Sequence, residues 1–255
     1  PLTPIQLSAE RLKRKYGASI TADRETFDKL TDTIVRQVGD IKTMVDEFAS
    51  FARMPQPEMA RTDLKDAVQE PVILFRESHP QIAYELNLPV VPLLADCDRR
   101  LITQAVTNLV KNASEAVATY AEAPEHKDFK GRVRVAVTQQ DDVAIIEVSD
   151  NGMGLPKQNR VRLLEPYVTT KGSKGTGLGL AIVQKIVEQH GGTLALDDSH
   201  PDATGRRGAC VRLSLPLHRR GLRPQAATAP PAKVTTSPAA PDVEPAPSAQ
   251  PRVSS

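Results

Sequence analysis

The amino-acid sequence predicts an α+β protein in which a helical hairpin is followed by a two-layer α/β sandwich and a disordered tail. Three observations lead to this prediction. Apolar residues alternate by threes and fours over the first fifty or so positions, strand-like and helix-like patterns alternate through the middle, and eight of the 21 prolines follow residue 223. We expect the hairpin over residues 1–53, a linker over 54–61, the sandwich over 62–218 and the tail over 219–255.

The predicted hairpin consists of two amphipathic helices. The first ends at Gly17, and residues 19–23 offer capping side chains for the second, which continues for about four heptads. This pattern is typical of a dimeric four-helix bundle, although a helix pair buried on a neighbouring domain of the same chain would show it too. The apolar stripe comprises Leu2, Ile5, Ala9, Leu12, Tyr16, Phe27, Leu30, Ile34, Ile41, Met44, Phe48 and Phe51, with the polar Gln37 at one position of the repeat and with Val38 and Val45 widening it.

The middle of the chain has the pattern of a mixed α/β domain. Long apolar-faced stretches predict helices over 98–121 and 177–192. Because strands that resemble hairpins alternate with these helices, a two-layer sandwich is favoured over a doubly wound parallel sheet. The predicted strands cover residues 72–77, 83–88, 133–140, 143–150, 193–198 and 209–217.

Composition excludes several classes of function. The 33 lysines and arginines nearly balance the 31 aspartates and glutamates, so charge gives no reason to expect a nucleic-acid partner. Cys97 and Cys210 are far apart, which argues against a disulfide framework or zinc site and fits a reducing compartment. No apolar run is long enough to span a bilayer and no signal peptide is present, so we expect no membrane contact by this segment.

Two asparagines on the predicted helix 98–121 are candidates for metal chemistry. Asn108 and Asn112 lie four residues apart and therefore share one face of the helix. Asparagine is unfavourable in the middle of a helix unless its amide has a partner, and an amide oxygen is a suitable ligand for Mg²⁺. Two solvated asparagines on an exposed face are the alternative.

A second candidate is the segment DNGMGLP, which follows a strand ending at Asp150. Gly152 and Gly154 permit positive φ angles and close approach of the backbone to a ligand. The Asp150 carboxylate could accept a hydrogen bond from an exocyclic amine such as that of adenine, whereas an oxo group there would leave two acceptors facing each other. An ordinary turn between two elements is the alternative.

The third candidate is the glycine-rich segment EPYVTTKGSKGTGLGLA, which leads into a helix. Exposed backbone amides and the start of the helix favour anions, and the segment adds lysines and threonines. The spacing matches neither the phosphate loop nor the dinucleotide-binding fingerprint, and a mobile loop is the alternative. The residues concerned are Thr169, Thr170, Lys171, Gly172, Lys174, Gly175, Gly177 and Gly179.

His190 is interpreted as a cation or hydrogen-bond donor near a helix C-terminus, with Gly191 as the left-handed residue that ends the helix. A catalytic role for His190 is disfavoured.

Together and in this order, the segments indicate one protein family far more specifically than any one of them does alone. Residues 62–217 resemble the ATP-binding catalytic domain of bacterial sensor histidine kinases, in the GHKL ATPase superfamily, and residues 1–52 resemble their dimerisation and histidine-phosphotransfer hairpin. NLVKNASEA resembles the N box, DNGMGLP the G1 box, PYVTTK the F box with Tyr167 in place of phenylalanine, and GTGLGLA the G2 box. Within the family, these segments are most similar to nitrogen-regulation kinases of the NtrY/NtrB kind.

The resemblance implies ATP and Mg²⁺ as ligands, with Asn112 binding the metal and Asp150 the adenine amine. Many histidine kinases carry a lysine where this chain has Glu115, which leaves Lys111 or Lys171 to supply that charge. The implied ATP-binding residues are Asn108, Lys111, Asn112, Asp150, Gly152, Gly154, Tyr167, Thr169, Thr170, Lys171, Gly175, Thr176, Gly177, Leu178 and Gly179.

The resemblance also places the phosphoacceptor outside this chain. The family motif has the form H-E-x-K-N-P, and Pro1 corresponds to its last residue. The chain therefore contains no catalytic nucleophile, and we expect that it cannot phosphorylate itself alone. In a longer protein, the phosphoryl group would pass from ATP to that histidine and then to an aspartate of a response-regulator receiver domain of the NtrX/NtrC kind.

The implied assembly is a homodimer formed through the hairpin, in the cytoplasmic portion of a protein anchored in the bacterial inner membrane. A nucleotide-binding dimerisation module without autokinase activity is the alternative function. A serine kinase of the anti-sigma type or a gyrase- or MutL-like ATPase is disfavoured by the hairpin and the tail.

Overall fold

The computed structural model describes residues 2–20, 22–171, 175–201, 205 and 207–218. The predictions for Pro1, Gly172, Lys174 and the tail 219–255 lie outside these residues. Within the described part of the chain, no helix is both long enough and apolar enough to cross a membrane.

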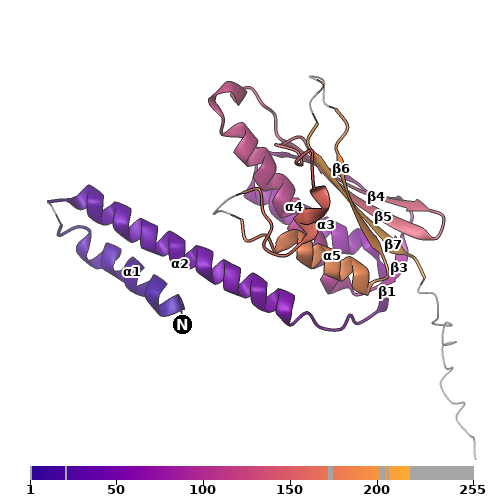
Figure 1. Cartoon of the computed structure of the whole chain (residues 1–255), viewed down its shortest axis with the longest axis horizontal. Helices are drawn as coiled ribbons and strands as arrows, with labels where there is room; N and C mark the ends of the chain where they lie inside the picture. Colours follow the sequence, from indigo (N-terminus) through magenta and orange to yellow (C-terminus); the bar gives the residue numbers. More distant parts are fainter. Residues whose placement is uncertain (1, 21, 172–174, 202–204, 206, 219–255) are drawn as a thin grey trace, which may run out of the picture. The chain divides into compact units, whose positions relative to one another are not determined.

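The predicted hairpin is present as α1 (Leu2–Tyr16) and α2 (Arg24–Ala52), which lie side by side in Figure 1. Gly17 closes α1 by donating its N–H to the Lys13 carbonyl at 3.0 Å, and a Cβ on Gly17 would lie 2.5 Å from that oxygen. Asp23 precedes α2 with a φ of 57°, but its side chain makes no capping hydrogen bond. Ala9 and Val38 are buried, whereas much of the apolar stripe is exposed.

The predicted strand at 72–77 is wrong, because these residues belong to a helix, α3 (Leu64–Ser78). The run of β-branched and aromatic residues suggested a strand, but the buried positions Leu64, Val68 and Val72 recur every four residues. The Asp63 carboxylate also caps the helix by accepting the N–H of Lys65 at 3.0 Å. Helical packing against α4 therefore prevails over local strand propensity.

The remaining predicted strands form a five-stranded sheet in the order β2-β4-β5-β7-β6. The β2–β4 pair is parallel and the other neighbours are antiparallel. A separate pair of short strands, β1 (Ala60–Asp63) and β3 (Leu94–Cys97), was not predicted. The sheet strands are β2 (Ala83–Asn87), β4 (Arg132–Gln140), β5 (Val143–Asp150), β6 (Thr193–Asp198) and β7 (Ala209–Pro216).

Helices α3, α4 (Arg99–Ala121) and α5 (Gly179–Gln189) cover one face of this sheet, so the predicted two-layer α+β sandwich is confirmed (Figure 1). The described part of the chain also contains short 3₁₀ helices over Pro124–His126 and Arg160–Leu164. Ile102 and Val106 of α4 are fully buried between the layers, together with Ile146 of β5. This core fixes α4 above the end of β5, where the polar candidate residues lie.

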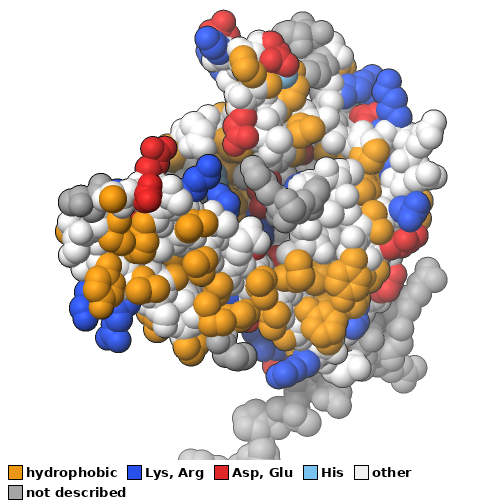
Figure 2. Space-filling model, turned by 60° about the vertical axis from the view of Figure 1, so that its left-hand side comes forward, with side chains coloured by type: hydrophobic (Ala, Val, Ile, Leu, Met, Phe, Trp, Pro, Cys, Tyr) orange, Lys and Arg blue, Asp and Glu red, His pale blue; other side chains and the backbone are white. Residues whose placement is uncertain are grey.

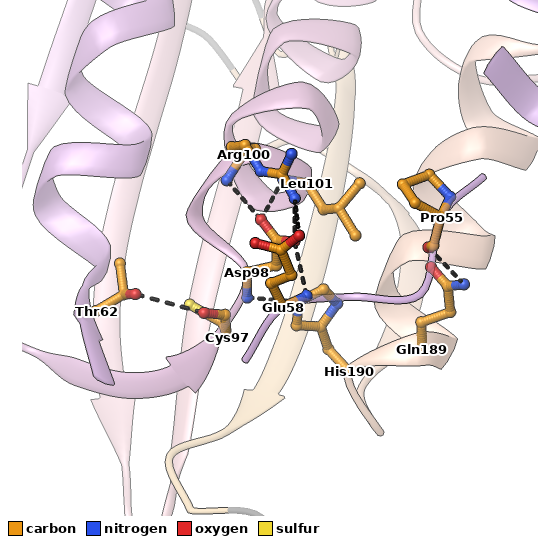
Figure 3. Close-up of polar contacts among 9 residues, drawn as sticks. All are labelled: Pro55, Glu58, Thr62, Cys97, Asp98, Arg100, Leu101, Gln189 and His190. Atoms are coloured by element: carbon orange, nitrogen blue, oxygen red, sulfur yellow. Dashed lines mark hydrogen bonds and ion pairs between the residues drawn. The ribbon is translucent and has the colours of Figure 1, made fainter. Parts of the chain in front are cut away.

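The linker, α4 and α5 meet at Asp98, whose side chain is only 2 % exposed (Figure 3). One carboxylate oxygen caps α4 by accepting the N–H of Arg100 at 2.9 Å, and the other accepts the N–H of Glu58 in the linker at 2.9 Å. Burial by itself raises the pKa of Asp98, but the hydrogen bonds from Glu58 and Arg100 outweigh it, and the pKa is lowered.

His190 takes part in the same junction, as a hydrogen-bond donor and not as a cation. The Asp98 N–H donates to Nε2 of His190 at 3.0 Å, so this nitrogen carries no proton. Nδ1 lies 2.7 Å from the Ile186 carbonyl and donates to it, as the donor interpretation expected. Gly191 follows with a φ of 71°. The ring therefore joins the end of α5 to the start of α4 as a neutral group (Figure 3).

Candidate nucleotide-binding site

The three polar segments singled out in the sequence converge on one cavity of about 190 Å³ between α4, the end of β5 and the start of α5. All but three of the predicted site residues line it; Gly152, Tyr167 and Leu178 do not. The lining residues among them are Asn108, Lys111, Asn112, Asp150, Gly154, Thr169, Thr170, Lys171, Gly175, Thr176, Gly177 and Gly179.

The α4 wall presents Asn108 and Asn112 to the cavity. The Asn112 side-chain oxygen accepts a hydrogen bond from Lys171 Nζ at 3.0 Å, and a Cβ on Gly179 would lie 3.5 Å from its amide nitrogen. Nδ2 of Asn108 is buried and has no hydrogen-bond partner among the residues that the structure describes. An orphaned amide is costly in a folded protein, so this donor indicates that a ligand with acceptor atoms completes the site.

At the opposite wall, Asp150 is 7 % exposed and its orientation is fixed by the backbone around it. Its Oδ1 accepts the N–H groups of Gly152 at 2.8 Å and Ala209 at 3.3 Å. A Cβ on Gly152 would lie 2.5 Å from the Ala116 backbone, so this glycine lets the loop pack tightly against α4. Gly152 therefore supports the wall from behind instead of lining the cavity.

A tight turn positions the glycine-rich segment. Tyr167 and Gly177 have φ angles of 68° and 69°, and the Tyr167 N–H donates to the Gly177 carbonyl at 3.0 Å. A Cβ on Gly177 would lie 2.5 Å from the Tyr167 backbone, so only glycine fits there. The Tyr167 ring is 59 % exposed, while Leu178 is fully buried and anchors the start of α5 in the core.

Charged groups are concentrated on the α4 and α5 sides of the cavity. Lys171 forms an ion pair with Glu115, the residue that stands where many histidine kinases have lysine. Lys111 pairs with Glu47 of α2 at 3.4 Å, and Thr176 donates a hydrogen bond to the same carboxylate. Both lysines that could supply charge thus lie in the lining, each beside a carboxylate.

Sequence reasoning missed the apolar side chains of the lining and the contribution of Glu47. Helical spacing could have found Leu109 and Ala113, which neighbour the asparagines on α4, and strand alternation could have found Val148, two residues before Asp150. Nothing in the local sequence marks Glu47. The apolar lining residues are Leu109, Ala113, Ala116, Val148, Leu155, Leu163, Val168, Leu180, Ala209 and Val211.

The arrangement therefore has two chemically different ends. Beside Asp150, the lining includes the apolar side chains of Val148, Ala209 and Val211, which suits a flat heterocycle that carries an amino group. Amides, lysines and the N-terminus of α5 surround the other end, which suits an anion. Among the described residues, no cluster of three or more His, Cys, Asp or Glu side chains is placed to hold a metal ion.

Comparisons with known proteins agree with this geometry. Residues 97–219 match the family model described as histidine kinase-, DNA gyrase B- and HSP90-like ATPase. The chain is 52 % identical over 215 residues to the nitrogen regulation protein NtrY of Azorhizobium caulinodans, an alignment that covers 84 % of this chain and 27 % of the relative. The chain thus spans about a quarter of the length of this curated relative.

Solved structures show the same fold. The mycobacterial sensor histidine kinase MprB superimposes with a TM-score of 0.52 at 28 % identity, covering 62 % of this chain and 97 % of the other. The histidine kinase ThkA, in complex with the response regulator protein TrrA, superimposes with a TM-score of 0.60 at 21 % identity. This second comparison covers 85 % of this chain and 57 % of ThkA, and it extends over the hairpin as well as the sandwich.

Proposed function

We propose that this chain, which belongs to the NtrY-like sensor histidine kinases of the GHKL ATPase superfamily, binds ATP with Mg²⁺ and presents its γ-phosphoryl group to a histidine. The single observation that carries the proposal is the convergence of Asn112, Asp150 and the Gly177 turn on one cavity, into which the unpartnered amide of Asn108 faces. Family membership and this geometry both support it.

The adenine ring would lie at the apolar end, with its amino group donating to the Asp150 carboxylate. The backbone N–H groups of Gly152 and Ala209 hold Oδ1, so the carboxylate cannot turn away when a different base enters. A guanine oxo group in that place would oppose one acceptor with another, at a cost of about 1–3 kcal/mol. The site should therefore discriminate ATP from GTP by about tenfold or more.

The triphosphate would lie at the polar end, where Asn108, Lys111 and Lys171 can donate to its oxygens. Asn112 fits a magnesium ligand, because its hard amide oxygen supplies one position and phosphate oxygens and waters supply the others. When bound, Mg²⁺ neutralises phosphate charge and orients the γ-phosphoryl group. Lys171 now donates to Asn112 at 3.0 Å, so this ammonium must move from the amide oxygen toward the phosphates.

The acceptor would be a histidine in the longer protein, in the motif that ends at Pro1. Its imidazole nitrogen bonds to the γ-phosphorus while the bond to the β–γ bridging oxygen breaks and ADP leaves. Such transfer depends mainly on positioning and electrostatics, which the residues of the cavity would supply. An aspartate in a receiver domain of the NtrX/NtrC kind would take the phosphoryl group next.

We also propose that the hairpin forms a homodimer. Ile34, Ile41 and Phe48 of α2 are each 44–49 % exposed in the single chain. Figure 2 shows hydrophobic side chains gathered where the hairpin comes forward. A second hairpin that covers this stripe would make a four-helix bundle.

In the full-length protein, this part would lie on the cytoplasmic side of the inner membrane, which membrane fractionation would test.

Calorimetry with ATP, ADP and GTP in Mg²⁺ tests the nucleotide assignment. We expect ATP and ADP to bind and GTP to bind at least about tenfold more weakly. Equal affinity for ATP and GTP would contradict the placement of adenine at Asp150.

Incubation with γ-labelled ATP tests the acceptor: the 255-residue chain should stay unlabelled. A chain extended upstream through the histidine should acquire acid-labile label, and failure to do so would favour a nucleotide-binding module without autokinase activity.

A further inference from the structure

We propose that Glu47 of α2 is an internal competitor of the nucleotide: its carboxylate occupies the polar end of the cavity and must leave before the phosphates can bind. The proposal rests on the proposed function, because it assigns that end of the cavity to phosphate. It adds a regulatory contact by which the hairpin controls nucleotide affinity.

The geometry of Glu47 carries the proposal. Glu47 lies in the second helix of the hairpin, more than 60 residues before Lys111, yet its carboxylate reaches the cavity lining and its side chain is only 24 % exposed. One oxygen lies 3.4 Å from Lys111 Nζ, and the other accepts a hydrogen bond from the Thr176 hydroxyl. Both partners belong to the groups that would otherwise contact phosphate oxygens.

Charge makes the two occupants incompatible. A carboxylate and a triphosphate are both anions, and in a partly desolvated cavity like charges repel more strongly than in water. The single positive charge of Lys111 balances the Glu47 carboxylate and is then not available to the triphosphate. The other described carboxylates in the lining, Glu115 and Asp150, are held by Lys171 and by backbone N–H groups, whereas Glu47 is held by Lys111 and Thr176, the groups assigned to the phosphates.

Separate contacts hold this end of α2 beside α5, so the position of Glu47 does not depend on its own ion pair. Lys185 Nζ donates to the Phe51 carbonyl at 3.2 Å and lies 4.9 Å from the centre of the Phe51 ring. Gln189 reaches the Pro55 carbonyl at 3.5 Å. The two effects are thermodynamically linked. If Glu47 lowers the affinity for nucleotide by some factor, bound nucleotide weakens the contact between the hairpin and the cavity by the same factor.

The test measures ATP affinity of the whole chain by calorimetry for Glu47→Gln, which removes the charge but keeps the size. We expect ATP to bind about three- to tenfold more tightly. The free energy of a partly exposed ion pair, together with the repulsion between its carboxylate and the phosphates, is no larger than this change in affinity. Asp46→Asn is the matched control: Asp46 is the adjacent acid, its side chain is 66 % exposed and it forms an ion pair with Lys42 of the same helix. This control should leave the affinity unchanged.

A second variant tests the same idea from outside the cavity. Lys185 does not line the cavity, and Lys185→Met removes the hydrogen bond that holds the Phe51 carbonyl. This variant loosens the end of α2 that carries Glu47, so ATP should bind more tightly than to the unmodified chain, but less tightly than to Glu47→Gln.

Unchanged ATP affinity in Glu47→Gln would overturn the competitor role, and weaker binding would instead make Glu47 a supporting group for the nucleotide or its metal. If Asp46→Asn tightened ATP binding equally, the effect would come from the net charge of the chain and not from the position of Glu47, and this result would also overturn the proposal. If the unmodified chain fails to bind ATP at all, the proposed function fails, which is a distinct result.

Discussion

The hairpin and the sandwich contain helices with similar amphipathic patterns but very different surroundings. Ile102 and Val106 of α4 are completely buried against the sheet, whereas Ile34 and Ile41 of α2 are 44 % and 46 % exposed. A helical apolar stripe therefore indicates that a partner is needed, but it does not say whether the partner is in the same chain. For α4 the partner is the sheet, and for α2 we infer a second copy.

Matched truncations in the two helices should separate these cases. Ile102→Ala opens a cavity in the core and should lower the free energy of unfolding by about 2–5 kcal/mol. Ile41→Ala should change the unfolding of dilute, monomeric chain by no more than about 0.5 kcal/mol. Urea denaturation at low concentration measures both. Sedimentation at high concentration should show dimer loss for Ile41→Ala only, and an unchanged dimer would count against the four-helix bundle.

The asparagine face of α4 offers the next effect in size. Asn112→Leu removes the proposed magnesium ligand at a similar side-chain size, and ATP affinity in Mg²⁺ should fall at least about thirtyfold, or 2 kcal/mol. The loss should be much smaller in EDTA. Asn159→Gly is a suitable control, because Asn159 is exposed, lies outside the cavity lining and has a φ of 55° that glycine adopts without strain. An equally large loss with and without metal would argue against magnesium ligation.

The residues before α2 and α4 give a smaller and equally direct comparison. Asp98 accepts N–H groups from α4 and from the linker, whereas Asp23 makes no capping hydrogen bond. Asp98→Asn turns an amide NH₂ toward a donor and should cost about 1–2 kcal/mol of unfolding free energy. Asp23→Asn should be close to neutral, since asparagine tolerates its φ of 57°. Similar losses at both sites would contradict the junction at Asp98.

The lowered pKa of Asp98 gives the smallest effect, a pH dependence of known sign. Because the pKa in the folded state lies below the usual 3.8, the stabilisation by Asp98 is fully present above that value and disappears as pH falls through the folded pKa. The difference in unfolding free energy between the unmodified chain and Asp98→Asn should therefore be constant near neutral pH and shrink below pH 4 or so. A difference that grows on acidification would have the wrong sign.

Much of the site could be predicted because its residues follow from regular local patterns. Alternation along 143–150 places Asp150 on the covered face of β5, and helical spacing places Asn108 and Asn112 together. The strand predicted at 72–77 is wrong because local strand propensity does not override the four-residue spacing of buried positions in α3. The acceptor role of His190 could not be predicted, because it depends on Asp98, which is 92 residues away.

Glu47 could not have been predicted at all. Its contacts with Lys111 and Thr176 join segments separated by 64 and 129 residues, and no local pattern encodes such a meeting. The same holds for Tyr167, whose backbone conformation depends on the turn that it makes with Gly177. Local sequence determines which residue types are available, and tertiary packing determines which of them meet.

The central claim is that this chain holds ATP through the Asp150 carboxylate. Calorimetry of Asp150→Asn with ATP and Mg²⁺ tests it most directly, with circular dichroism to confirm that the fold is intact. The account predicts that ATP binding is abolished, because the amide can present an NH₂ group to the adenine amine in place of an acceptor. Unchanged affinity in a folded variant would contradict the claim.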